Sequence, residues 1–91
     1  GVATFIGVVL ALYPPGGLAV CGVWLAAAAL TRYSSVGALA GSAAAAPLFI
    51  LFDRWEAVLL LVVMTAILWL AHAKNIRRLI RGEESKIGGA K

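Results

Sequence analysis

Residues 55–73 read WEAVLLLVVMTAILWLAHA, and residues 74–81, directly after them, read KNIRRLIR. The first stretch is almost entirely apolar and approaches the roughly 20 residues with which a helix crosses a bilayer. The second is rich in lysine and arginine, which are enriched at the cytoplasmic ends of membrane-spanning helices. Together these stretches predict a membrane protein with a basic juxtamembrane segment.

The composition of the whole chain supports this prediction. Of the 91 residues, 63% are hydrophobic and 13% are charged, whereas soluble globular proteins have about 45–50% and about 25%. A domain of this size has too little interior to bury so much apolar surface. The composition therefore excludes a disordered chain, a secreted disulfide scaffold and an ordinary cytosolic enzyme.

Four apolar runs make up most of the chain: residues 1–13, 18–31, 36–52 and 55–73, with a basic tail at 74–91. A helix is the only open-ended structure that satisfies its own backbone in lipid. We therefore expect an all-α integral membrane protein, a polytopic transmembrane helix bundle with four helices in a single domain, residues 1–91. Because residue 1 is glycine rather than methionine, we expect the chain to begin partway through a longer protein.

Small residues recur at intervals of four in the third run, at Gly37, Gly41 and Ala45. This spacing puts them on one side of a helix, where small side chains allow a neighbouring helix to come close. We therefore expect the third helix to pack tightly against a neighbour along this side.

The positive charge is concentrated at one end of the chain. The net charge is +4, and before residue 74 the cations Arg32 and Arg54 are balanced by Asp53 and Glu56. The preference for basic residues on the cytoplasmic side then places the C-terminus in the cytoplasm. It also brings residues 1–4, 32–35 and 72–75 to the same membrane face. A basic tail directly beside an apolar run leaves no room for a nucleic-acid-reading domain, so no nucleic-acid partner is expected.

This face carries the side chains that are suited to chemistry. His72 and Asn75 lie three residues apart, so a helix presents both on one side. An imidazole and an amide in that position can bind an oxyanion or orient a hydroxyl. The alternative interpretation is a polar, interfacial end of a transmembrane helix. Ser34 and Ser35 precede the third run, and the simplest role for them is an N-cap.

The first residues of the chain are a further candidate for anion binding. Gly1, Val2, Ala3 and Thr4 begin a helix at the same face, where free backbone N–H groups point at an anion. Many helices begin in this way, so these residues alone are weak evidence. With one histidine, one cysteine and few carboxylates, the sequence offers no dedicated metal site. We expect neither a metal nor a cofactor.

The order of the polar motifs is distinctive. Gly1-Val2-Ala3-Thr4 comes first, Thr31-Arg32-Tyr33-Ser34-Ser35 follows, and His72-x-x-Asn75-Ile76-x-Arg78-Leu79 ends the apolar part. Gly82-x-Glu84 and Lys86-Ile87-Gly88 come after it. In this order the motifs resemble the C-terminal part of the acyl-phosphate:glycerol-3-phosphate acyltransferase (PlsY) family, over essentially the whole chain.

The resemblance implies a multi-pass enzyme of the bacterial inner membrane with seven helices and a cytoplasmic C-terminus, of which this chain would supply the last four helices. It implies transfer of a fatty acyl group from acyl phosphate to the 1-hydroxyl of glycerol 3-phosphate. The product would be lysophosphatidic acid for phospholipid synthesis. The implied partners are the two substrates and membrane lipids, with no obligate protein partner.

The resemblance also implies roles for individual residues. His72 and Asn75 would act at the substrates, and Ser35, together with Ser34, would contribute a hydroxyl to substrate binding. Gly1–Thr4 would belong to a phosphate-binding loop, and Glu84 would have a structural role. The family's Gly-Gly-Lys before this loop and its Ser/Arg motif are not in the sequence. We therefore expect the chain alone to bind glycerol 3-phosphate poorly and not to turn over.

Two hypotheses for the function stand side by side. In the first, the hydroxyl of glycerol 3-phosphate attacks the carbonyl of acyl phosphate directly, without an acyl-enzyme, because a mixed anhydride needs mainly positioning and charge neutralisation. His72 would then orient the hydroxyl or stabilise charge. In the second, the chain is a non-catalytic small multi-spanning membrane protein, or an assembly subunit with a basic cytoplasmic tail.

Overall fold

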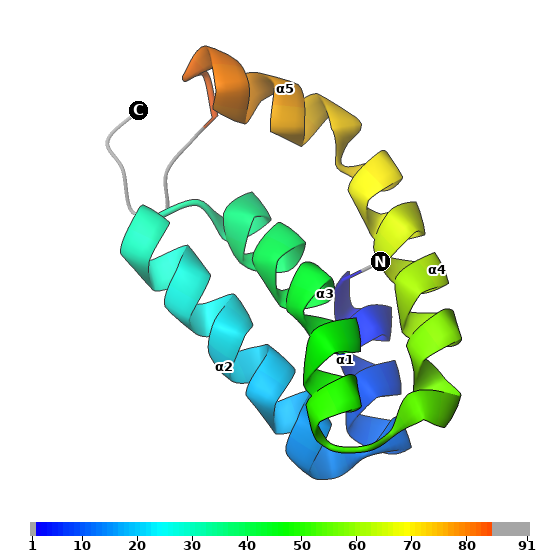
Figure 1. Cartoon of the computed structure of the whole chain (residues 1–91). Coiled ribbons are helices and arrows are strands. Elements are labelled where there is room, and N and C mark those ends of the chain that lie inside the picture. Colours follow the sequence, from blue (N-terminus) through cyan, green and yellow to red (C-terminus); the bar gives the residue numbers. More distant parts are fainter. Residues whose placement is uncertain (1, 85–91) are drawn as a thin grey trace.

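The computed structural model describes residues 2–84, and within them every regular element is helical (Figure 1). This confirms the all-α prediction. The elements, in chain order, are α1 (Val2–Leu12), α2 (Pro14–Thr31), α3 (Ser34–Leu51), the short 3-10 helix η1 (Trp55–Ala57), α4 (Val58–Ala71) and α5 (Ala73–Arg81).

Helix α2 begins earlier than its apolar run because the two prolines lie in its first turn. Pro14 and Pro15 occupy the first helical positions, after Tyr13 in an extended conformation with φ of −162°. Proline is favourable there, since the N–H that it lacks has no partner within the helix and its ring already holds a helical φ. The Pro-Pro-Gly-Gly stretch is therefore the start of a helix as well as the end of the previous one.

Helix α3 also starts before its apolar run, at Ser34. Its N-cap is Tyr33, and no side chain caps this end of the helix. The N-cap interpretation of Ser34 and Ser35 is therefore wrong, because both serines lie inside the first turn. Their hydroxyls are consequently not needed for capping.

The fourth run is divided at His72 into α4 and α5, which meet at an angle of 60°. His72 has φ of −98° and ψ of 16°, and its N–H bonds the carbonyls of Leu68 and Trp69 at 3.0 and 3.1 Å. Helix α5 then ends at Gly82 with φ of 72°, and the N–H of Glu83 bonds the carbonyl of Arg78 at 2.7 Å. This is a glycine C-cap, which confirms the helix stop expected from the sequence.

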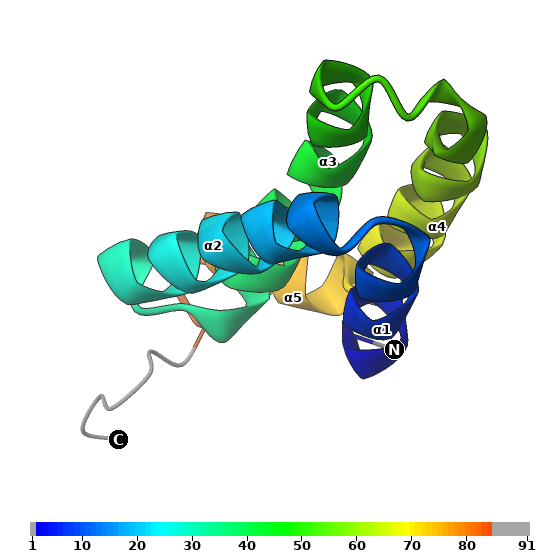
Figure 2. The same cartoon turned by 90° about the horizontal axis from the view of Figure 1, so that it is seen from below.

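Two helices, α2 and α3, are each long and apolar enough to cross a membrane. The bent pair formed by residues 55–71 and α5 is a third candidate span, whereas α1, with 11 residues, is shorter. In Figure 1, α5 runs across the end of the bundle at which α2 ends and α3 begins. The view from below shows α2 beside α3 and α1 beside α4 (Figure 2).

The contact between α2 and α3 depends on glycine. Trp24 of α2 lies against the side of α3 that carries Gly37 and Gly41. A Cβ at Gly41 would stand 2.5 Å from the indole, and one at Gly37 would stand 2.8 Å from the Trp24 carbonyl. Both distances are shorter than side chains tolerate. The close packing expected from the small residues is confirmed, and Ala45 on the same side is fully buried.

Hydrogen bonds join α3 to α4 inside the apolar bundle. The Trp69 indole N–H donates to the Leu39 carbonyl at 3.3 Å and to the Ser42 hydroxyl at 3.2 Å. The Thr65 hydroxyl donates to the Ser42 carbonyl at 2.9 Å. Because polar groups in an apolar interior are costly unless they are paired, these bonds fix the position of α4 along α3.

The opposite end of the bundle is held by aromatic contacts. The Tyr13 ring lies edge-on to Phe52 at 5.3 Å and to Phe49 at 6.4 Å between centroids. The Arg54 guanidinium lies 4.2 Å from the centre of the Tyr13 ring, as a cation–π pair does. The turn between α3 and η1 is thereby attached to the start of α2.

Candidate active site

A polar pocket of about 280 Å³ opens at the end of the bundle that α5 crosses. Helices α1, α2 and α3 and the break between α4 and α5 all contribute to it. It is lined by Val2, Trp24, Ser34, Ser35, Ala38, His72 and Asn75. The pocket therefore joins polar residues that are far apart in the sequence.

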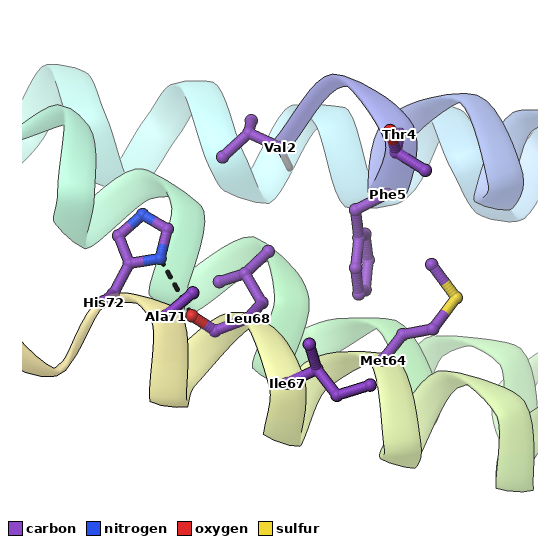
Figure 3. A pocket seen from close by; sticks show the side chains of 8 residues that line it. All are labelled: Val2, Thr4, Phe5, Met64, Ile67, Leu68, Ala71 and His72. Atoms are coloured by element: carbon purple, nitrogen blue, oxygen red, sulfur yellow. Dashed lines mark hydrogen bonds between the residues drawn. The ribbon is translucent and has the colours of Figure 1, made fainter.

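His72 owes its position to the break between the two helices. Its Nδ1 lies 2.9 Å from the Leu68 carbonyl oxygen. A carbonyl only accepts, so Nδ1 carries the proton in this contact. Nε2 then holds the lone pair of the neutral ring, and Figure 3 shows this side of the ring turned away from α4. The imidazole therefore has one nitrogen anchored to the backbone and the other directed at the space between the helices.

Glu84 joins three of the polar residues. Its Oε2 accepts hydrogen bonds from the Ser35 hydroxyl at 2.9 Å and from the Asn75 amide at 3.0 Å. Its Oε1 accepts one from Arg78 Nε at 2.7 Å. The segment after α5 thus turns back, and one carboxylate connects it to α5 and to the first turn of α3. Since Ser35 and Asn75 line the pocket, Glu84 holds two of its walls in place.

These contacts stabilise the ionised form of Glu84. The Arg78 guanidinium, the Asn75 amide and the Ser35 hydroxyl, in that order, lower the pKa of the Glu84 carboxyl from 4.5 to about 2. Its side chain is 11% exposed, whereas that of Arg78 is 45% exposed. At neutral pH the carboxylate is therefore charged and acts as an acceptor for all three groups. It has no proton to give to a substrate.

An apolar groove of about 240 Å³ lies between α1 and α4 (Figure 3). In Figure 3, Phe5 points from α1 toward α4, and Met64 and Ile67 point toward it from the other side. The lining residues are Val2, Thr4, Phe5, Met64, Ile67, Leu68, Ala71 and His72. Val2 and His72 line both spaces, so the groove and the polar pocket meet at the imidazole.

The predicted site residues are distributed unevenly over these two spaces. Ser34, Ser35, His72 and Asn75 line the polar pocket together with Val2. Thr4 lines the apolar groove instead. Ala3 is exposed and lines neither of them, and Gly1 lies outside the described residues.

Two contributors to the site were not predicted from the sequence. Trp24 forms part of the pocket wall, and no local pattern distinguishes it from an ordinary apolar position of α2. Arg78 binds Glu84, and here a local signal exists. Gly82 between them is typical of a helix stop that reverses the chain, so a residue shortly after it is expected to return to the last turn.

Comparison with known proteins decides the family. The sequence model described as "Glycerol-3-phosphate acyltransferase" matches residues 1–82. The chain belongs to this family. No solved structure matches it. The resemblance noted in the sequence is thereby confirmed at the level of the family.

Curated glycerol-3-phosphate acyltransferases from several bacteria are similar to the chain. The protein of Nitrobacter winogradskyi is 48% identical over 88 residues, which is 97% of this chain and 45% of the relative. That of Roseobacter denitrificans is 50% identical over 91 residues, 100% of this chain and 46% of the relative. The chain thus spans about half the length of the glycerol-3-phosphate acyltransferases that it matches.

Proposed function

We propose that the protein is a membrane acyltransferase that moves a fatty acyl group from acyl phosphate to the 1-hydroxyl of glycerol 3-phosphate. The observation that carries this proposal is the position of His72, where the polar pocket and the apolar groove meet. A fatty acyl donor is apolar over most of its length, whereas glycerol 3-phosphate is small, polar and charged. The two substrates need two such spaces that share a reactive point.

In this proposal the polar pocket holds the acceptor and the reacting carbonyl. The Asn75 amide and the hydroxyls of Ser34 and Ser35 supply hydrogen-bonding groups. His72 Nε2 accepts the hydrogen bond of the acceptor hydroxyl and so orients its oxygen toward the carbonyl. The acyl chain lies in the apolar groove, where the lining side chains of α1 and α4 exclude water.

The reaction is a direct displacement. The 1-hydroxyl oxygen forms a bond to the carbonyl carbon, and the bond from that carbon to the phosphate oxygen breaks. Phosphate leaves and the hydroxyl proton passes to a phosphate oxygen, so the products are lysophosphatidic acid and inorganic phosphate. Because the donor is a mixed anhydride with a good leaving group, positioning and charge neutralisation supply most of the rate enhancement.

The hydrogen bonding of the pocket supports a route without an acyl-enzyme. A serine nucleophile needs a general base that accepts its proton. Ser35 donates its hydroxyl to the Glu84 carboxylate, whose pKa of about 2 makes it a weak base. Cys21 does not line the pocket. Within residues 2–84 no serine or cysteine is hydrogen-bonded to His72.

For the location, we propose the bacterial inner membrane, with the pocket and the C-terminus on the cytoplasmic side. Helix α5 lies at the pocket end and carries four basic residues and no acidic ones, as cytoplasmic segments commonly do. Glycerol 3-phosphate is charged and water-soluble, so it would reach the pocket from the cytoplasm.

The test is an assay in a scaffold that supplies the rest of the relatives' length. The chain replaces the matching stretch of the Roseobacter denitrificans relative, and lysophosphatidic acid formation is measured with acyl phosphate and, separately, with acyl-coenzyme A. We expect product with acyl phosphate alone. Product with acyl-coenzyme A at an equal rate would contradict the proposed donor. A well-folded chimera without activity on either donor would favour the non-catalytic alternative.

His72→Ala in the same chimera tests the residue that carries the proposal. We expect kcat to fall about 100-fold or more, since positioned proton-accepting groups contribute about 10² to 10⁴. The matched control is Leu70→Ala on α4, because Leu70 is 76% exposed and lines neither the pocket nor the groove. Full activity of His72→Ala would remove the imidazole from the mechanism, and a covalent acyl-enzyme trapped during turnover would exclude direct displacement.

A further inference from the structure

Helix α5 has two chemically opposite sides. On a helix with 3.6 residues per turn, its four basic residues project within about 100° of arc. The apolar residues Ile76, Leu79 and Ile80 occupy the other side. Ile76 and Leu79 pack partly against the core, whereas Ile80 is 81% exposed. The basic residues of this helix, which we call the cationic face, are Lys74, Arg77, Arg78 and Arg81.

The cationic face is separate from the proposed active site. Asn75 and His72 line the polar pocket, whereas the four basic residues line a shallow depression of about 180 Å³ together with Glu83. Lys74, Arg77 and Arg81 are exposed. Arg78 is bound to Glu84. Three exposed cations therefore surround a space that the proposed acyl transfer does not use.

The direction of α5 places this face at a membrane surface. The helix turns 60° away from residues 55–71, which are apolar enough to lie in lipid. An amphipathic helix with a basic side and a separate apolar side lies in the interface, where its apolar residues enter the acyl region and its cations meet headgroups. The exposed Ile80 fits contact with lipid, since water would leave its apolar surface unpaired.

We propose that the cationic face of α5 binds the phosphate groups of anionic phospholipids in the leaflet in which the helix lies. Charge complementarity selects this partner over a neutral lipid, because three exposed cations on one side create a positive local potential. The proposal does not depend on the acyl transfer, and it would hold for a non-catalytic membrane protein as well.

The test measures lipid preference directly. The chain is purified in a neutral detergent and incubated with equal amounts of phosphatidylglycerol and phosphatidylcholine, and the lipids that it retains are counted by native mass spectrometry. We expect phosphatidylglycerol to be retained preferentially. Equal retention of the two lipids would overturn the proposal.

Charge variants locate the preference on the helix. Each basic residue near an anionic surface strengthens binding about fivefold, so we expect R77Q/R81Q to lower the preference by up to about 25-fold. R77K/R81K keeps the charge and is expected to keep the preference. The matched control K86Q/K91Q removes the same charge outside α5 and is expected to change little. An equal loss in both glutamine pairs would show a general attraction to the basic C-terminal region and would overturn a site on α5.

Two further measurements separate lipid binding by these charges from a loss of helix and from binding of a soluble phosphate. Far-UV circular dichroism of R77Q/R81Q should match that of the unaltered chain, and a lost preference with an altered helix content would count against a specific role of the two charges. Inorganic phosphate and glycerol 3-phosphate are added at constant ionic strength. We expect neither to displace phosphatidylglycerol, and displacement at millimolar concentration would assign the depression to a soluble phosphate rather than to lipid.

Discussion

α2 and α3 touch closely along their length, whereas α1 and α4 stand apart around a groove of about 240 Å³. Both pairs consist of apolar helices. In the first pair, Gly37 and Gly41 let the Trp24 indole lie directly on α3. In the second, bulkier side chains such as Phe5 and Met64 face each other and hold the backbones apart. In this bundle the size of the side chains, rather than their hydrophobicity, decides where room for a ligand remains.

The largest expected effect is on the close pair. Gly41→Leu introduces a side chain whose Cβ alone would stand 2.5 Å from Trp24, so the helices must move apart. We expect the free energy of unfolding to fall by about 1–3 kcal/mol, as overpacking does. Thermal unfolding in detergent, followed by far-UV circular dichroism, measures it. Gly22→Leu is the control, because a Cβ at Gly22 meets nothing within 4 Å, and an equal loss there would show that close approach to Trp24 is not the cause.

Filling the groove tests the open pair. Ala71→Leu extends a side chain into the space between α1 and α4, so we expect the chimeric enzyme to prefer shorter acyl chains. Each methylene kept out of the groove costs about 0.8 kcal/mol of apolar burial, or about fourfold in kcat/KM for a long donor. A series of acyl phosphates of increasing length measures this. Ala66→Leu is the control, because Ala66 is exposed on the same helix and does not line the groove. An unchanged length profile of Ala71→Leu would place the acyl chain elsewhere.

The hydrogen bonds between α3 and α4 should contribute less than the glycine contacts. Trp69→Phe removes the N–H that donates to the Leu39 carbonyl and the Ser42 hydroxyl, and it keeps most of the ring. We expect a loss of about 1 kcal/mol in the free energy of unfolding. Trp55→Phe is the control, since Trp55 is 61% exposed. If the two variants were equally stable, these bonds would not hold α4 in place.

The smallest expected effect is the pH dependence at Glu84. The pKa of its carboxyl is lowered from 4.5 to about 2, so the folded state favours the ionised form. Its contribution to stability is complete above pH 4.5 and is lost as the pH falls toward 2. Because Arg78 is 45% exposed, we expect less than about 1 kcal/mol.

Unfolding midpoints at pH 6 and pH 3 measure this contribution. The decrease between the two values should be smaller in Glu84→Gln than in the unaltered chain. Glu83→Gln is the control, because Glu83 is exposed and is not hydrogen-bonded to Ser35 or Asn75. A decrease of the same size in Glu84→Gln and the unaltered chain would show that the carboxylate does not support the pocket at low pH.

Much of the candidate site was predictable because its residues follow short-range patterns. The three-residue spacing of His72 and Asn75 predicted that they act together, and both line the polar pocket. The N-cap expected of Ser35 was wrong, because its hydroxyl binds Glu84, which lies 49 residues further along the chain. No local pattern announces a partner at that distance. The role of Trp24 in the pocket wall was unpredictable for the same reason.

The sequence by itself determined the class of the protein. Its apolar runs, small residues and basic end predict helices in a membrane, because length, hydrophobicity and charge act locally along the chain. Only the tertiary structure decided that α4 turns at His72 and that the groove and the pocket meet there. These features depend on which side chains meet between helices, and that is set by size and hydrogen bonding across the bundle rather than by any single segment.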